Sequence, residues 1–129
     1  MKRSGFDDVP QLVAEYRKTA VLWDSLHAIA EMRKKGASKR ANAVFRVNHS
    51  LYRRLRSSAI GRNAVEELMR DPAEGVRLLA ATHVLPWNPG EAVGILQAIQ
   101  ESTDGRGHAF AAAETLRVFR SGKLDLDWE

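Results

Sequence analysis

Residues 71–91 read DPAEGVRLLAATHVLPWNPGE and contain one complete predicted helix together with the start of the next. Both starts share a polar cap, a proline and a glutamate at the same spacing: Asp71, Pro72 and Glu74, then Asn88, Pro89 and Glu91. A polar cap accepts from a free backbone N–H, proline suits the first helical turn, and the glutamate can reach back to close a capping box. The pattern therefore predicts two consecutive helices.

The first of these helices is apolar on two sides. Its main apolar line recurs at helical spacing, through Val76, Leu79, Ala80, His83, Val84 and Trp87, and a second line contains Leu78 and Leu85. A helix of this kind is sandwiched between neighbours and does not lie on a surface. We therefore expect an all-α fold of five or six helices, stacked as antiparallel hairpins in a short α-solenoid.

Helical periodicity also predicts two elements before this segment. A first helix runs from Asp8 to about Lys35 and is stopped by Gly36, with the weak helix formers at 19–21 as the place where it would break. A second helix, capped by Ser38, runs to about residue 57, and Gly61 separates it from a short third helix. The N-terminal part is thus predicted to be a long helical hairpin.

The C-terminal part is predicted to end in a helix and an extended tail. The fifth helix ends near 103–105, and the sixth covers 107–121 with Phe110 in its core face and Gly122 as its C′ residue. Residues 124–129 alternate strictly between apolar and acidic, which indicates an extended segment. Either the tail is a strap that completes the core, or its acids lie near the basic helix and compete with an anionic ligand. The predicted domain has three parts: a long hairpin over 1–60, two further hairpins over 61–123, and an acidic tail over 124–129.

Sequence motifs in the same region resemble a known repeat. Ala64-Val65-x-x-Leu68 is echoed by Ala92-Val93-x-x-Leu96 at a period of roughly thirty residues. Asp71-Pro72, Val76-Arg77, Ala80-Ala81 and Leu85 resemble the second-helix signature of HEAT-type repeats. The region from about Leu51 to Leu124 is similar to a family of small bacterial all-helical proteins that is catalogued only as a domain of unknown function. The resemblance implies a HEAT-like fold, no active site, and structural roles for Asp71 and Arg77.

The composition is that of a single globular domain without disulfides. The 129 residues are 44% hydrophobic and 28% charged, which suffices for a buried core. The chain has no cysteine, which excludes thiolate metal sites and cysteine nucleophiles. Because no apolar run is long enough to span a bilayer and MKRSGFDDVPQ lacks a signal-peptide core, we expect a cytoplasmic protein without a membrane partner.

The charge is distributed unevenly. Residues 32–65 hold ten bases and no acid, whereas the rest of the chain holds ten bases and sixteen acids. Five side chains of the second helix are predicted to share one side and form a basic stripe: Lys39, Arg46, His49, Arg53 and Arg56. We expect this stripe to bind an acidic protein partner, with nucleic acid as the alternative. Phe45 and Tyr52 lie at its edge, where they are either core residues, which we favour, or stacking platforms for bases.

No catalytic or metal-binding pattern stands out. His27, His49, His83 and His108 are far apart, without HExxH or an acidic cluster at ligand spacing. His83 is predicted to be a hydrogen-bonded core histidine and His108 a helix-start residue. No nucleophile has a recognisable base beside it. We therefore expect no metal, no cofactor and no enzyme, but a protein-binding module such as a small adaptor or an immunity-type inhibitor.

Overall fold

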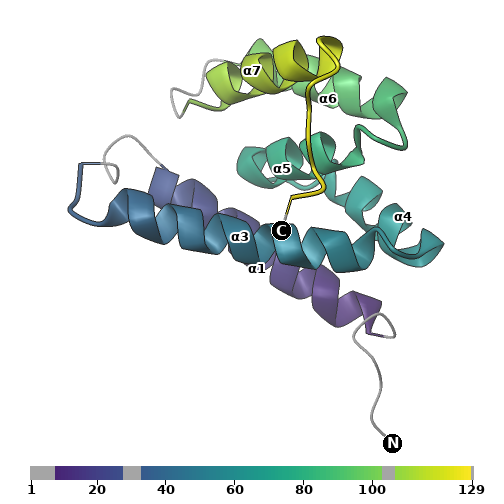
Figure 1. Ribbon diagram of the computed structural model, residues 1–129, viewed down its shortest axis with the longest axis horizontal. Helices are drawn as coiled ribbons and strands as arrows, with labels where there is room; N and C mark the ends of the chain where they lie inside the picture. The colour runs from purple at the N-terminus through teal and green to yellow at the C-terminus, as the bar shows by residue number, and fades with distance from the viewer. Residues whose placement is uncertain (1–7, 28–32, 103–106, 129) are drawn as a thin grey trace, which may run out of the picture.

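The fold is a stack of three helical hairpins (Figure 1). The computed structural model describes residues 8–27, 33–102 and 107–128, and within these ranges the chain forms six helices and no strand, as the all-α prediction required. The pairs are α1 with α3, α4 with α5, and α6 with α7. Their bounds are α1 Val9–His27, α3 Ala37–Leu55, α4 Ala59–Leu68, α5 Glu74–Val84, α6 Pro89–Gln100 and α7 His108–Arg120.

Helix α5 is the centre of the stack. It contacts α1, α4, α6 and α7, and eight of its eleven residues are buried. Burial on both sides confirms that this helix is sandwiched between neighbours. No described helix has both the length and the apolar character needed to cross a membrane.

Asp71 and Arg77 have structural roles at the turn before α5. The Asp71 carboxylate accepts from the Arg17 guanidinium of α1 at 2.7 and 3.1 Å, and from the Ala73 N–H at 2.9 Å. Arg77 donates to the backbone oxygens of Asp71 and Pro72 at 2.8 and 3.0 Å. Burial alone would raise the pKa of Asp71, but these donors outweigh it and hold that pKa below its ordinary value. The two residues therefore brace the turn and tie it to α1.

The capping box predicted at this turn is wrong. Helix α5 begins at Glu74 with Ala73 as its N-cap, and Glu74 lies 2.7 Å from Nδ1 of His108. The other ring nitrogen of His108 lies 2.5 Å from the Asp24 carboxylate of α1, so both nitrogens donate and the ring is an imidazolium. A charged donor binds a carboxylate more strongly than a backbone N–H does, which explains why Glu74 is not a cap. Gly75 makes room for this bridge, because a Cβ there would lie 2.6 Å from the Asp24 carboxylate.

Two predictions for the N-terminal hairpin are also wrong. Helix α1 is continuous through 19–21, where the Thr19 hydroxyl donates to carbonyl oxygens of its own helix and Ala20 is buried. Packing thus overrides the weak propensity of these residues. Helix α3 begins before Ser38, because Gly36, at φ 81°, supplies the turn without a side-chain cap. The predicted continuation of the first helix over 28–32 lies outside the described residues.

Corrections are also needed in the later helices. Gly61 lies inside α4, whose cap is Ser58, and does not separate two helices. Asn88 is the N-cap of α6 by position, but its amide donates to Glu91 at 3.3 Å. Phe110 is 73% exposed, since α7 ends the stack and packs mainly on α5 and α6. The predicted end of the fifth helix at 103–105 lies outside the described residues.

The C-terminal end of α7 agrees with the prediction. Gly122 has φ 77° as the C′ residue, and the N–H of Lys123 donates to the Val118 oxygen at 3.2 Å. This is the bond of a Schellman motif, and it directs the following residues away from the helix.

Gly61 allows the closest backbone approach in the stack, which gives a stability prediction. A Cβ at Gly61 would lie 1.8 Å from the Leu55 carbonyl oxygen, whereas a Cβ at Gly94 in α6 would meet nothing within 4 Å. Gly61→Ala should lower the free energy of unfolding by about 3 kcal/mol or more. Gly94→Ala should raise it by about 0.5–1 kcal/mol, because the unfolded chain loses entropy. Urea denaturation of both variants measures the contrast, and equal effects would contradict it.

Candidate functional site

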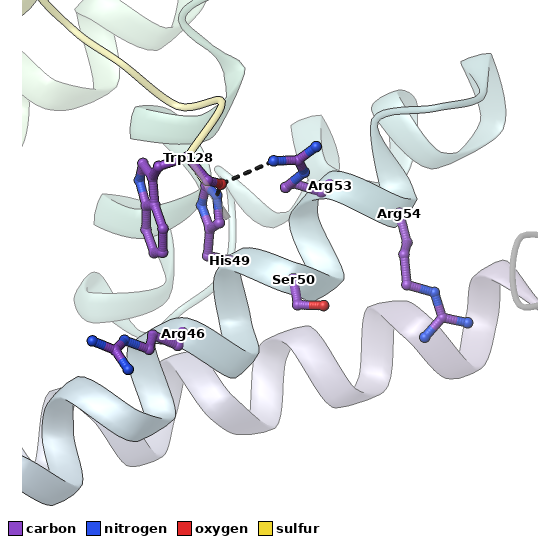
Figure 2. A pocket seen from close by; sticks show the side chains of 6 residues that line it. All are labelled: Arg46, His49, Ser50, Arg53, Arg54 and Trp128. Atoms are coloured by element: carbon purple, nitrogen blue, oxygen red, sulfur yellow. Dashed lines mark hydrogen bonds between the residues drawn. The ribbon is translucent and has the colours of Figure 1, made fainter.

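A groove of about 330 Å³ runs along the outer side of α3, beside the end of the chain. Figure 2 shows its lining residues: Arg46, His49, Ser50, Arg53, Arg54 and Trp128. Three of them are arginines and none is acidic. From Arg46 to Arg54 the groove follows the helix for about 12 Å, since each residue rises about 1.5 Å. The groove is therefore long enough to contact several residues of a partner.

One wall of the groove is the C-terminal strap, residues 123–128. The strap runs extended from α7 past α5 to α3 (Figure 1). Leu124 and Leu126 pack against the core, and the Trp128 indole stacks on the His49 ring with centroids 3.5 Å apart and planes 6° apart. Phe45 lies beside the same indole at 5.9 Å. These contacts confirm the prediction that the apolar side of the tail completes the core.

Basic side chains of α3 hold the polar side of the strap. His49 Nε2 donates to the Trp128 carbonyl at 2.6 Å, and Arg53 donates to the carbonyls of Asp127 and Trp128 at 2.7 and 2.9 Å. Arg56 pairs with the Asp127 carboxylate at 2.9 Å. Asp127 thus lies beside the basic stripe as predicted, although most of the bonds go to backbone oxygens, and Glu129 lies outside the described residues.

The basic stripe is divided by this contact. His49, Arg53 and Arg56 bind the strap, and His49 is only 2% exposed because the indole covers it. The prediction that His49 lies on an open helix face was therefore wrong. Lys39 and Arg46 are exposed, and Arg46 lines the groove.

Sequence reasoning missed three groove residues: Ser50, Arg54 and Trp128. Arg54 was not assigned to the stripe, although a helical projection places it only about 80° from Arg46. No local sequence pattern could place Trp128 in the groove, because it contacts a residue 79 positions earlier in the chain. The aromatic residues at the edge of the stripe were assigned correctly: Tyr52 is buried and Phe45 is half-buried against the core.

The environment of His49 fixes its protonation. Burial lowers the pKa of His49 most, the hydrogen bond to the Trp128 carbonyl opposes it, and the charges of Arg53 and Arg56 lower the pKa further against a smaller effect of Asp125. The ring is therefore neutral at pH 7, with its proton on Nε2 where it donates to the strap. Its Nδ1 is a buried acceptor with no partner among the residues that the structure describes.

A buried polar chain connects the core to the strap. The Tyr16 hydroxyl lies 2.6 Å from Nδ1 of His83, and the Tyr52 ring stacks on His83 at 4.0 Å. Arg56 donates to the Tyr52 hydroxyl at 3.0 Å. Burial lowers the pKa of His83 to about 3, helped by the charge of Arg56 and by that of His49 when His49 is protonated. His83 is thus the neutral, hydrogen-bonded core histidine that the sequence predicted.

The described ranges contain no group of three or more His, Cys, Asp or Glu side chains that could hold a metal ion. No family model, curated protein or solved structure matches the chain. What the site does must therefore be inferred from its geometry.

Neutral His83 makes the stability of the fold depend on pH. Unfolded chains protonate this residue below its ordinary pKa of 6.5, but the folded protein does so only near 3. The stability from neutral His83 is complete above pH 6.5 and is lost as the pH falls from there towards 3. The slope is about 1.4 kcal/mol per pH unit.

His83→Gln isolates this effect, because glutamine can accept from Tyr16 but does not titrate. Urea denaturation between pH 7 and 4 should show the wild-type advantage shrinking as the pH falls. Carboxylates elsewhere act equally on both proteins. A constant difference across this range would contradict the prediction.

The strap should also control the titration of His49. Deleting residues 124–129 removes the indole that covers the ring, so the pKa of His49 should rise towards its ordinary value. The pKa of His83, buried by the helices themselves, should stay low and is the internal control. NMR titration of the histidine ring protons measures both. An unchanged pKa for His49 would mean that the strap does not bury it in solution.

Proposed function

We propose that this protein is a non-enzymatic binding module, a small cytoplasmic adaptor or inhibitor, which binds an acidic segment of a protein partner along the outer side of α3. The observation that supports this best is the groove itself. It is lined by Arg46, Arg53 and Arg54 without an acidic side chain, on a chain whose remaining parts carry an excess of acids. An acidic segment is the complementary ligand.

The chemistry of the groove suits carboxylates. Arginine presents a planar fork of donors that binds a carboxylate through two parallel hydrogen bonds. Arg46 and Arg54 are exposed, so a partner desolvates them only partly and the cost of burial is small. Val47, 52% exposed on the same helix, adds an apolar contact of the kind that protein interfaces combine with arginine.

The aromatic side chains near the groove favour protein over single-stranded nucleic acid. Base stacking needs an open aromatic face. Tyr52 is fully buried, Phe45 is half-buried beside Trp128, and the indole stacks on His49. Binding of backbone phosphates by the same arginines, without stacking, is the alternative function.

The strap limits which part of the basic stripe a partner meets first. Arg53 and Arg56 already bind strap atoms, so the exposed cations of the stripe are Lys39 and Arg46, with Arg54 beside them. Competition between the strap acids and an anionic ligand stays a prediction.

The double variant Arg46→Glu, Arg54→Glu tests the proposed function without touching the strap. Binding of a poly-glutamate peptide should weaken at least about tenfold, because two attractive charges become repulsive. Lys18→Glu, Arg120→Glu makes the same change in net charge on α1 and α7, and should weaken binding by less than about twofold. Fluorescence anisotropy with labelled peptide measures both variants.

A single-stranded oligodeoxynucleotide of equal length is the competing probe in that experiment. Tighter binding of the oligonucleotide, with a steep salt dependence that the groove variant loses, would favour nucleic acid instead. Equal effects of the two double variants would show that only net charge matters and would overturn the proposal.

A further inference from the structure

A second space, of about 150 Å³, lies beneath the strap and is separate from the basic groove. Its walls come from α1, α3, α5, α7 and the strap, and they include the aromatic rings of Trp23, Phe45 and Trp128. Leu126 and Trp128 of the strap line it as well, so the strap closes one side. A space of this volume can hold one benzene-sized molecule.

His83 gives this cavity a hydrogen-bond donor. Burial raises the pKa of Tyr16 well above its usual value, so the phenol keeps its proton and donates it to Nδ1 of His83. The His83 proton is therefore on Nε2, for which no acceptor is found among the described residues. His49, whose ring lies 6.3 Å away, donates from Nε2 to the strap, and its Nδ1 is buried out of reach of the cavity. The Nε2–H of His83 is thus the unused polar group.

Threonine hydroxyls add to the polar part of the lining. Thr82 donates to the Leu78 carbonyl at 2.8 Å, which leaves its oxygen as an acceptor. Thr115 of α7 lines the cavity from the opposite helix. No Asp, Glu, Lys or Arg side chain lines it. Because a charged ligand would lose its hydration without a counter-charge, the cavity selects against ions.

We propose that this cavity is a binding site for a small neutral aromatic molecule of about the size of phenol. Its ring packs among Trp23, Phe45 and Trp128, and its polar group accepts from His83. The C-terminal strap forms one wall of the site through Leu126 and Trp128. The site does not depend on the acidic partner proposed above.

Phenol is the probe, because its hydroxyl oxygen can accept a hydrogen bond from His83. Titration of the full chain, followed by NMR of the His49 and His83 rings and the Trp128 indole, should show saturable shifts with a Kd of about 1 mM or below. Toluene matches phenol in size but cannot form hydrogen bonds, and should bind several-fold more weakly. Benzoate, which is charged, should bind at least about tenfold more weakly.

Two substitutions at Thr115 locate the probe. Thr115→Leu fills part of the cavity and should weaken phenol binding at least about tenfold. Thr115→Val keeps the volume and should change it by less than about threefold. An absence of saturable shifts would mean that the cavity holds only ordered water, and equal binding to the wild type and Thr115→Leu would place phenol elsewhere. Either result would overturn the proposal.

Discussion

The hydrogen bond between Tyr16 and His83 is the interaction on which the rest of the structure depends. Both side chains are buried, so an unmade bond would leave two polar groups without water, at a cost of about 1–3 kcal/mol each. The bond fixes α1 against α5 and sets the plane of the imidazole, on which Tyr52 stacks at 4.0 Å. Tyr52 then positions Arg56, and Arg56 holds the strap through Asp127. The path of the last residues over the surface thus depends on the Tyr16–His83 hydrogen bond in the core.

This connection divides α3 between two tasks. His49 and Arg53, together with Arg56 at the C-cap, hold the end of the chain. Arg46 and Arg54 line the same groove as His49 and Arg53, but the described contacts give them no bond to the strap (Figure 2). A ligand beneath the strap and a partner in the groove would therefore act on neighbouring turns of one rigid helix, with Trp128 contributing to both spaces.

Local patterns in the sequence predicted the parts of the fold that local physics determines. The two apolar lines of α5 identified a sandwiched helix, and Gly122 identified the end of α7, because spacing and backbone conformation decide both. The same patterns could not find the bridge between Glu74 and His108, 34 residues apart, or the stack of Trp128 on His49. Such distant partners compete with local ones. Glu74 pairs with the His108 ring and therefore does not cap its own helix. The sequence therefore predicted the candidate groove only in part. Helical spacing identified basic side chains of the groove, but it could not place the wall formed by Trp128.

The remaining cations of α3 have no role in stability that the described contacts show. The strap uses three basic side chains, and the Asp71 turn uses Arg17 and Arg77 from other helices. Lys39, Arg46 and Arg54 are exposed on a helix that contains no acid, so none of them forms an ion pair within that helix. Neutral residues would hold this helix equally well. Three cations to which the described contacts give no structural role are thus an independent reason to regard the outer side of α3 as a binding surface.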